Sequence, residues 1–199
     1  VSINLASGLA SAGAADPNVV VTLPGGSTAA AAMVCSSQPS PWAAAQTGSN
    51  WISPIASCTS DQATGQFRYD VSFTLPSGAT GLRLQASVLA DDNASAQLNG
   101  HPLTLSNNGG SLNTLAALDT SDQSIFRSGS NTLSFFVNNQ GGATGLDFKA
   151  SVTSSGANGN AQAEDEGENH GQCVSEVAHD TEPGPGHGEA VSQAAHDCD

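Results

Sequence analysis

The chain has 199 residues, of which 18 are Asp or Glu and only 4 are Lys or Arg, so its formal net charge is −14. Such a surface is a poor partner for nucleic acid or an anionic membrane, because binding phosphates requires clustered cations. With 38% hydrophobic and 11% charged residues, the composition excludes a disordered chain or a coiled coil. The apolar runs are too short for a membrane span, and we take a chain that opens at Val1 as a processed, exported protein located outside the cell or on its surface.

The N-terminal region carries short apolar segments, which predict strands at 3–5, 19–23 and 30–34. The segment 66–75 then alternates strictly, with apolar side chains at the odd positions from 67 to 75 and polar ones at the positions between them. This alternation predicts an antiparallel strand with one buried face.

The same alternation recurs at 82–88, 133–137 and 146–152. Between the first two of these segments, Asn99 and Gly100 predict a hairpin turn, because a type I′ turn needs positive φ at both central residues. We therefore predict an all-β domain over residues 1–153, an antiparallel two-sheet jelly-roll sandwich.

The C-terminal part differs sharply in charge. Residues 164–199 hold ten carboxylates and no Lys or Arg, and the preceding segment 154–163 has the small, polar composition of a linker. Two similar copies, HGQCVSEVAHD and HGEAVSQAAHD, lie 17 residues apart, separated by a turn rich in Pro and Gly. We predict a small helical hairpin over 164–199.

A resemblance to a known group is carried by two stretches, FRYDVSFTLPSGATGLRLQASVLADDNASAQLNGHPL and FRSGSNTLSFFVNNQGGATGLDFKASV. They resemble the jelly-roll, galactose-binding-like domains of secreted bacterial surface proteins, over roughly residues 1–152. The resemblance implies the sandwich fold, and domains of this group serve as sugar-binding modules, adhesins or passive structural layers. The two copies in the tail resemble a short His-Gly/Ala-His repeat near the C-terminus of exported bacterial proteins.

Four cysteines divide evenly between the two regions, with Cys35 and Cys58 in the sandwich and Cys173 and Cys198 in the tail. In an exported chain this predicts two local disulfide bonds, although three pairings exist in principle. The tail also holds four histidines that either remain solvated or bind a metal ion, alone or with the two tail thiolates. They are His170, His179, His187 and His196.

Two further sets of residues are candidates for ligand binding. Asp91, Asp92 and Asn93 offer adjacent oxygen ligands for calcium, and the alternative is an acidic loop that ends a strand. Trp42 and Trp51 are suited either to stacking on a sugar ring or to filling the core. The fold requires no cofactor, and calcium or another divalent ion is the one kind of bound ion that we consider.

The sequence contains no GxSxG, HExxH or glycine-rich phosphate loop, so we expect no enzymatic activity. Our first hypothesis is an extracellular structural protein that binds copies of itself to form a filament, sheath or biofilm matrix. Ile3 and Leu5 would then pair with a neighbouring chain. The alternative is a carbohydrate-binding module or adhesin domain with a polysaccharide as its partner.

Overall fold

The computed structural model describes residues 1–26 and 28–156, which form an antiparallel β-structure. Within these ranges the regular structure is all strand, apart from short 3-10 turns at Asn107–Gly109 and Gln123–Ile125. The strands are β1 (Ser2–Ala6), β2 (Ala15–Thr22), β3 (Ala29–Val34), β4 (Ile52–Ser53), β5 (Gly65–Leu75), β6 (Thr80–Asp91), β7 (Asn93–Leu98), β8 (His101–Leu103), β9 (Ala116–Thr120), β10 (Gly129–Asn139) and β11 (Gly145–Gly156). The predicted all-β fold is confirmed for this part of the chain.

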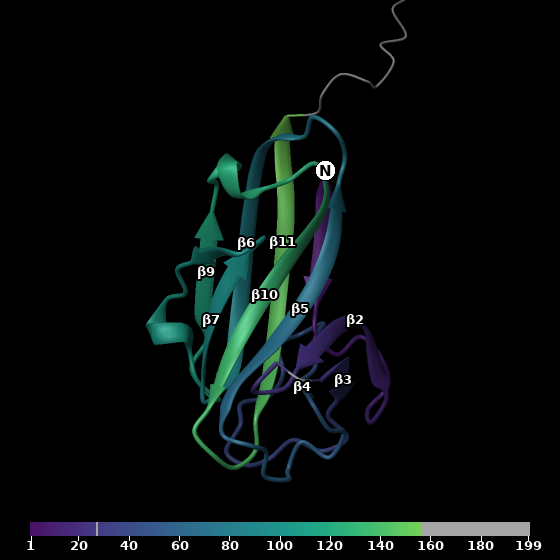
Figure 1. Cartoon of the computed structure of the whole chain (residues 1–199), viewed down its shortest axis with the longest axis vertical. Helices are drawn as coiled ribbons and strands as arrows, with labels where there is room; N and C mark the ends of the chain where they lie inside the picture. The colour runs from purple at the N-terminus through teal and green to yellow at the C-terminus, as the bar shows by residue number, and fades with distance from the viewer. Residues whose placement is uncertain (27, 157–199) are drawn as a thin grey trace, which may run out of the picture. The chain divides into compact units, whose positions relative to one another are not determined.

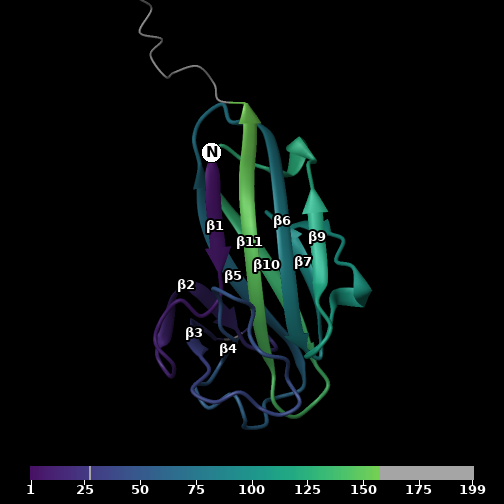
Figure 2. The ribbon, with the colours of Figure 1, turned by 180° about the vertical axis from the view of Figure 1, so that it is seen from behind.

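The strands lie in two layers, which Figures 1 and 2 show from opposite sides. The first layer, called here the front sheet, has the order β8-β7-β10-β5-β2-β3. The second, the back sheet, is built on β11, with β6 and β9 along one side and β1 and β4 along the other. The short strand β4 joins the layers, because Ile52 pairs with both Val34 of β3 and Leu146 of β11.

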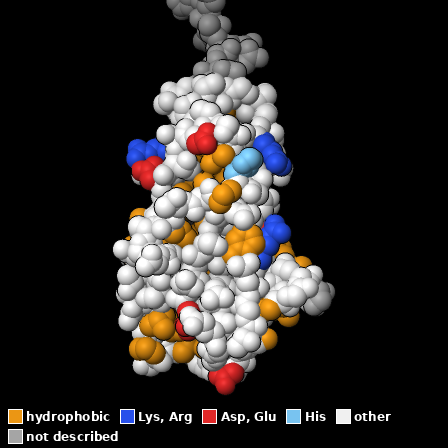
Figure 3. Space-filling model, turned by 60° about the vertical axis from the view of Figure 1, so that its left-hand side comes forward, with side chains coloured by type: hydrophobic (Ala, Val, Ile, Leu, Met, Phe, Trp, Pro, Cys, Tyr) orange, Lys and Arg blue, Asp and Glu red, His pale blue; other side chains and the backbone are white. Residues whose placement is uncertain are grey.

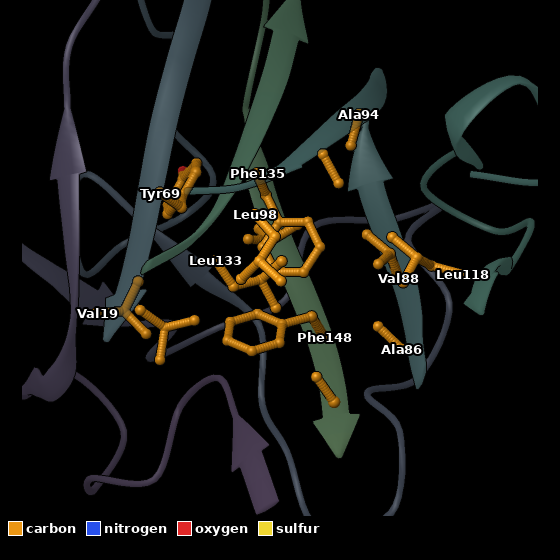
Figure 4. Packing of buried hydrophobic residues seen from close by; sticks show 14 of the residues in the cluster. Val19, Tyr69, Ala86, Val88, Ala94, Leu98, Leu118, Leu133, Phe135 and Phe148 are labelled. Atoms are coloured by element: carbon orange, nitrogen blue, oxygen red, sulfur yellow. The ribbon is translucent and has the colours of Figure 1, made fainter. Parts of the chain in front are cut away.

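The core lies between the two sheets and is filled by alternate side chains of their strands (Figure 4). In β5 the odd-numbered side chains from Phe67 to Leu75 are buried, as the alternation predicted. Phe135 of β10 and Phe148 of β11 contact each other, with ring centroids 4.8 Å apart. Burial of this large apolar surface is the main favourable contribution to folding.

The predicted turn at Asn99 and Gly100 is confirmed. These residues have φ values of 53° and 87°, and they join β7 to β8, which pair as antiparallel neighbours. The strand β11 extends three residues into the segment that we predicted to be a linker, up to Gly156. The predicted helical hairpin, with its cysteines and histidines, lies outside the described residues.

Ile3 and Leu5, which we expected to pair with a neighbouring chain, lie in β1 and pair with β11 of the same chain. Leu5 is opposite Ala150, and both Ile3 and Leu5 pack partly buried against the core. The structure therefore places this apolar alternation in an intramolecular contact, because β1 covers the edge of β11. No helix in the described part of the chain has the length and apolarity needed to cross a membrane.

Candidate functional site

The outward faces of the two sheets carry mainly small polar side chains, since the alternation that fills the core turns the other residues to solvent. Figure 3 shows one side of the molecule, where charged groups are few and separate hydrophobic patches lie within uncharged surface. A large side chain on such a face therefore calls for an explanation.

Phe136 is such a side chain, on the outward face of the front sheet. It follows the buried Phe135 in β10 and is itself only half-buried. Across β10 it lies opposite Arg68 of β5 on one side and Ser95 of β7 on the other. Phe136 is therefore held at the middle of the sheet by two paired strands.

Polar contacts fix the position of Arg68 beside this ring. The guanidinium carbon of Arg68 lies 5.9 Å from the ring centroid of Phe136, within the range of a cation–π contact. Arg68 Nε donates to Asp70 Oδ1 at 2.8 Å, and Ser134 Oγ donates to the same oxygen at 2.6 Å. The contacts therefore orient the guanidinium against the aromatic ring.

A hollow of about 230 Å³ lies beside the ring. Its lining combines the ring with exposed amide and hydroxyl groups from β5, β7 and β10. The lining residues are Gln66, Asn93, Ala94, Ser95, Phe136 and Asn138. Within the described residues, no hydrogen bond engages the side-chain amides of Gln66, Asn93 or Asn138, so their donors and acceptors face solvent.

This combination suits a sugar. A pyranose has an apolar face of C–H groups that can pack on an aromatic ring, and hydroxyls at its edge that exchange hydrogen bonds with amides. A small number of polar groups around an apolar surface is also the general pattern of a small-molecule site. We call the six lining residues the Phe136 hollow.

Sequence analysis missed Phe136, although the sequence contained the signal. The alternation Leu133, Phe135, Val137 assigns the inward positions of this strand, and it therefore turns Phe136 outward. An aromatic residue at an outward position of a polar strand was the feature to notice.

The two tryptophans occupy a separate buried cluster and not a sugar platform. Trp42 and Trp51 are 6% and 2% exposed, and their ring centroids lie 4.3 Å apart. Trp51 Nε1 donates to the carbonyl of Ala43 at 2.9 Å, while Leu89 packs against the pair. In this structure both rings serve as core, the second of the two uses that the sequence left open.

The same cluster contains the disulfide bond between Cys35 and Cys58. Its presence agrees with the pairing predicted within the sandwich. Cys173 and Cys198 lie outside the described residues, as do His170, His179, His187 and His196.

The acidic step at the end of β6 has its carboxylates already engaged by protein donors. Asp91 Oδ2 accepts a hydrogen bond from Trp42 Nε1 at 2.6 Å, and Asp92 Oδ2 accepts one from the backbone N–H of Gln140 at 2.7 Å. Asn93 is exposed and lines the Phe136 hollow. Among the described residues, no three His, Cys, Asp or Glu side chains gather where they could hold a metal ion.

Burial has a clear electrostatic effect on Asp91. Removal from water raises the pKa of its carboxyl, the hydrogen bond from Trp42 acts in the opposite direction, and the neighbouring Asp92 raises the pKa further. Asp91 therefore serves as a hydrogen-bond acceptor for Trp42. Its surroundings disfavour the charged form of its carboxyl.

No protein-family model and no curated protein matches the chain. Among solved structures, a family 35 carbohydrate binding module from Clostridium thermocellum is 10% identical with a TM-score of 0.44, and the match covers 77% of this chain and 99% of that module. The CBM35 of Abf62 from Cellvibrio japonicus is 14% identical with a TM-score of 0.40, covering 79% of this chain and all of that one.

Larger enzymes are also similar in part. An FMN-binding beta-glucuronidase from Facaelibacterium prausnitzii is 18% identical with a TM-score of 0.43 over 75% of this chain. The chain spans 23% of the length of that enzyme.

Proposed function

We propose that the sandwich is a non-catalytic carbohydrate-binding module in which Phe136 stacks on a sugar ring. The observation that carries the proposal is the ring itself, half-buried at the centre of a polar sheet face and bordered by side-chain amides that form no hydrogen bond with residues 1–26 or 28–156. Gln66, Asn93 and Asn138 would exchange hydrogen bonds with the sugar hydroxyls, and Arg68 would hold the ring in place through the cation–π contact.

The proposal includes a location outside the cell. It is supported by the disulfide bond between Cys35 and Cys58, since such bonds persist in oxidising compartments. Polysaccharides of cell walls and extracellular matrices would then be the available ligands.

The test is retention of the full chain on insoluble cellulose, xylan, mannan, chitin and pectin. We expect Phe136→Ala to weaken binding to the retained polysaccharide about fivefold, because loss of a stacking contact costs on the order of 1 kcal/mol. Phe136→Tyr keeps a ring and should retain binding. Val20→Ala is the matched control, since Val20 is an exposed apolar residue on the same sheet face, outside the hollow.

Two results would contradict the proposal. One is that the intact chain is retained on none of these polysaccharides. The other is that Phe136→Ala binds as tightly as the unmodified chain.

A further inference from the structure

We propose that the back sheet carries a second saccharide site, so that one molecule holds two polysaccharide segments and cross-links them. This inference rests on the proposed function of the Phe136 hollow and adds a site on the opposite face of the sandwich. It is carried by a groove on the back sheet. The described residues that line this groove are all different from those that line the Phe136 hollow.

The groove has a volume of about 640 Å³ and runs over β1, β11 and β6. Its floor contains a cross-strand row in which Asn4 lies opposite Ser151, and Ser151 lies opposite Gln85. In the next row, Lys149 of β11 lies opposite Ser87 of β6. Neighbouring strands are about 4.8 Å apart, so each row presents polar side chains at short, regular intervals across the sheet.

The loop before β4 forms a wall of this groove and is fixed in place by a buried carboxylate. Asp147 of β11 is fully buried and accepts hydrogen bonds from Gln46 N at 2.8 Å and from Ser7 Oγ at 3.2 Å. Lys149 Nζ donates to the carbonyl of Thr47 at 2.8 Å. Because these contacts already hold the loop, the groove exists before a ligand binds, and less ordering is needed on binding.

The floor keeps hydrogen-bonding capacity for a ligand. Within the described residues, no hydrogen bond engages the side chains of Asn4 or Ser151, whereas Gln85 Nε2 donates to Asp119 and Ser87 Oγ donates to Gln46. Lys149 pairs with no carboxylate in this part of the chain, unlike Arg68 and Arg83, which form salt bridges with Asp70 and Asp119. Amide, hydroxyl and ammonium groups together suit a ligand that is rich in hydroxyls.

Among the described residues, the lining of the groove includes aliphatic side chains such as Leu9 but no aromatic ring, so a single sugar would gain little from it. Several sugar units lying across the rows would each meet a polar side chain, and the hydrogen bonds would add up along the chain. We therefore assign to this groove an extended segment of the polysaccharide that the Phe136 hollow binds. The outer faces of the two sheets point in opposite directions, as the paired views show, so the two segments lie on opposite sides of the molecule (Figures 1 and 2).

The experiment measures binding and bridging separately. Particles of the retained polysaccharide are coated with the full chain, washed, and exposed to a soluble, fluorescent form of the same polysaccharide. The unmodified chain should capture it on the particles. A double variant in the groove, Gln85→Ala with Lys149→Met, should still coat the particles through Phe136 but capture about tenfold less.

Two further variants keep the test sharp. Asn4→Ala with Ser151→Ala alters the same floor through different residues and should lose capture to a similar degree. Arg127→Gln removes a positive charge at a position outside the groove and should capture normally. Melting temperatures confirm that each variant is folded.

The outcomes distinguish the two proposals. If the chain coats the particles in a Phe136-dependent way but captures nothing, the second site is overturned and the first stands. If both groove variants still capture the soluble polysaccharide, the groove is not the second site. The bridging would then come from self-association or from another surface of the chain. With the groove altered by Asn4→Ala and Ser151→Ala, coating that does not depend on Phe136 overturns the proposed function itself.

Discussion

At the scale of single residues, Asp91 shows how a buried carboxylate is tolerated when a donor is supplied. The residue is 8% exposed and receives the indole N–H of Trp42, which is itself buried against Trp51. The hydrogen bond offsets only part of the desolvation, since the net effect is a raised pKa. The charged form therefore costs stability at neutral pH.

The sign of the pH dependence follows. Because the pKa of Asp91 is higher in the folded protein than in the unfolded chain, the folded state takes up its proton first as the pH falls. The contribution of Asp91 to stability therefore improves from neutral pH down to the unfolded pKa of about 3.9. Asp119 and Asp122 have lowered pKa values, caused by hydrogen bonds from Arg83 and Ser124, so their contributions are lost only as the pH falls through and below that value.

We expect Asp91→Asn to raise the free energy of unfolding at pH 7 by on the order of 1 kcal/mol, since an amide oxygen can still accept from Trp42 without carrying charge. This gain should shrink as the pH is lowered toward 4. Urea unfolding at several pH values measures it, with Asp61→Asn as the control at an exposed carboxyl elsewhere in the chain. A gain that stays constant over this pH range would show that charge burial is not its cause.

At the scale of elements, β1 is a short edge strand whose inward side chains complete the core beside β11. Its register places Ile3 opposite Val152 and Leu5 opposite Ala150, both of which face the core. The apolar alternation at the N-terminus is thus explained within one chain.

Leu5→Ala should lower the free energy of unfolding by about 1–2 kcal/mol, less than for a fully buried leucine, because Leu5 is only partly buried. Val20→Ala, at an exposed position of β2, should change it little. Urea unfolding measures the stability of each variant, and sedimentation measures its oligomeric state. If Leu5→Ala dissociates an assembly without affecting the stability of the single chain, Ile3 and Leu5 act between chains after all.

The sequence predicted the long strands well because each has one buried face and therefore a clear alternation. Strand β5 follows this pattern along its whole length, and β6, β10 and β11 follow it over part of theirs. The short strands β4 and β9 were missed, since two to five residues carry too little periodicity to be recognised.

The candidate site was harder to predict because it depends on which strands become neighbours. Asn93, Gln66 and Asn138 are far apart in the sequence, and only the pairing of β10 with both β5 and β7 brings them around Phe136. Tryptophan is a residue type that often stacks on sugars, so Trp42 and Trp51 were reasonable candidates. In the structure they pack against each other and Trp42 donates to Asp91, so both rings are buried.

At the scale of the whole molecule, the end of the sandwich near β4 is held by covalent and apolar contacts more than by long strands. The disulfide bond between Cys35 and Cys58 closes a loop with a sequence separation of 23 and packs with Trp42 and Trp51. The loop contains only the two-residue strand β4, so its order depends on this cluster.

Replacing Cys35 and Cys58 by alanine should lower the free energy of unfolding by about 3 kcal/mol, through the greater freedom of the unfolded chain. Reductant should destabilise the sandwich of the unmodified protein similarly and leave the unfolding of the sandwich in the double variant unchanged. Urea unfolding with and without reductant makes the comparison. A reduced protein as stable as the oxidised one would mean that the Trp42–Trp51 cluster alone orders the loop.

The pairing of β1 with β11 also determines how the sandwich responds to mechanical load. The two strands are antiparallel and Ser154 N donates to the Val1 carbonyl at 3.1 Å, so residues 1 and 154 lie side by side. Tension between these points acts along the inter-strand hydrogen bonds, which run perpendicular to the strands, and opens them one after another. Pulled between residues 1 and 154, the fold should therefore unzip from β1, whereas a load between the two proposed sites would bypass this ladder.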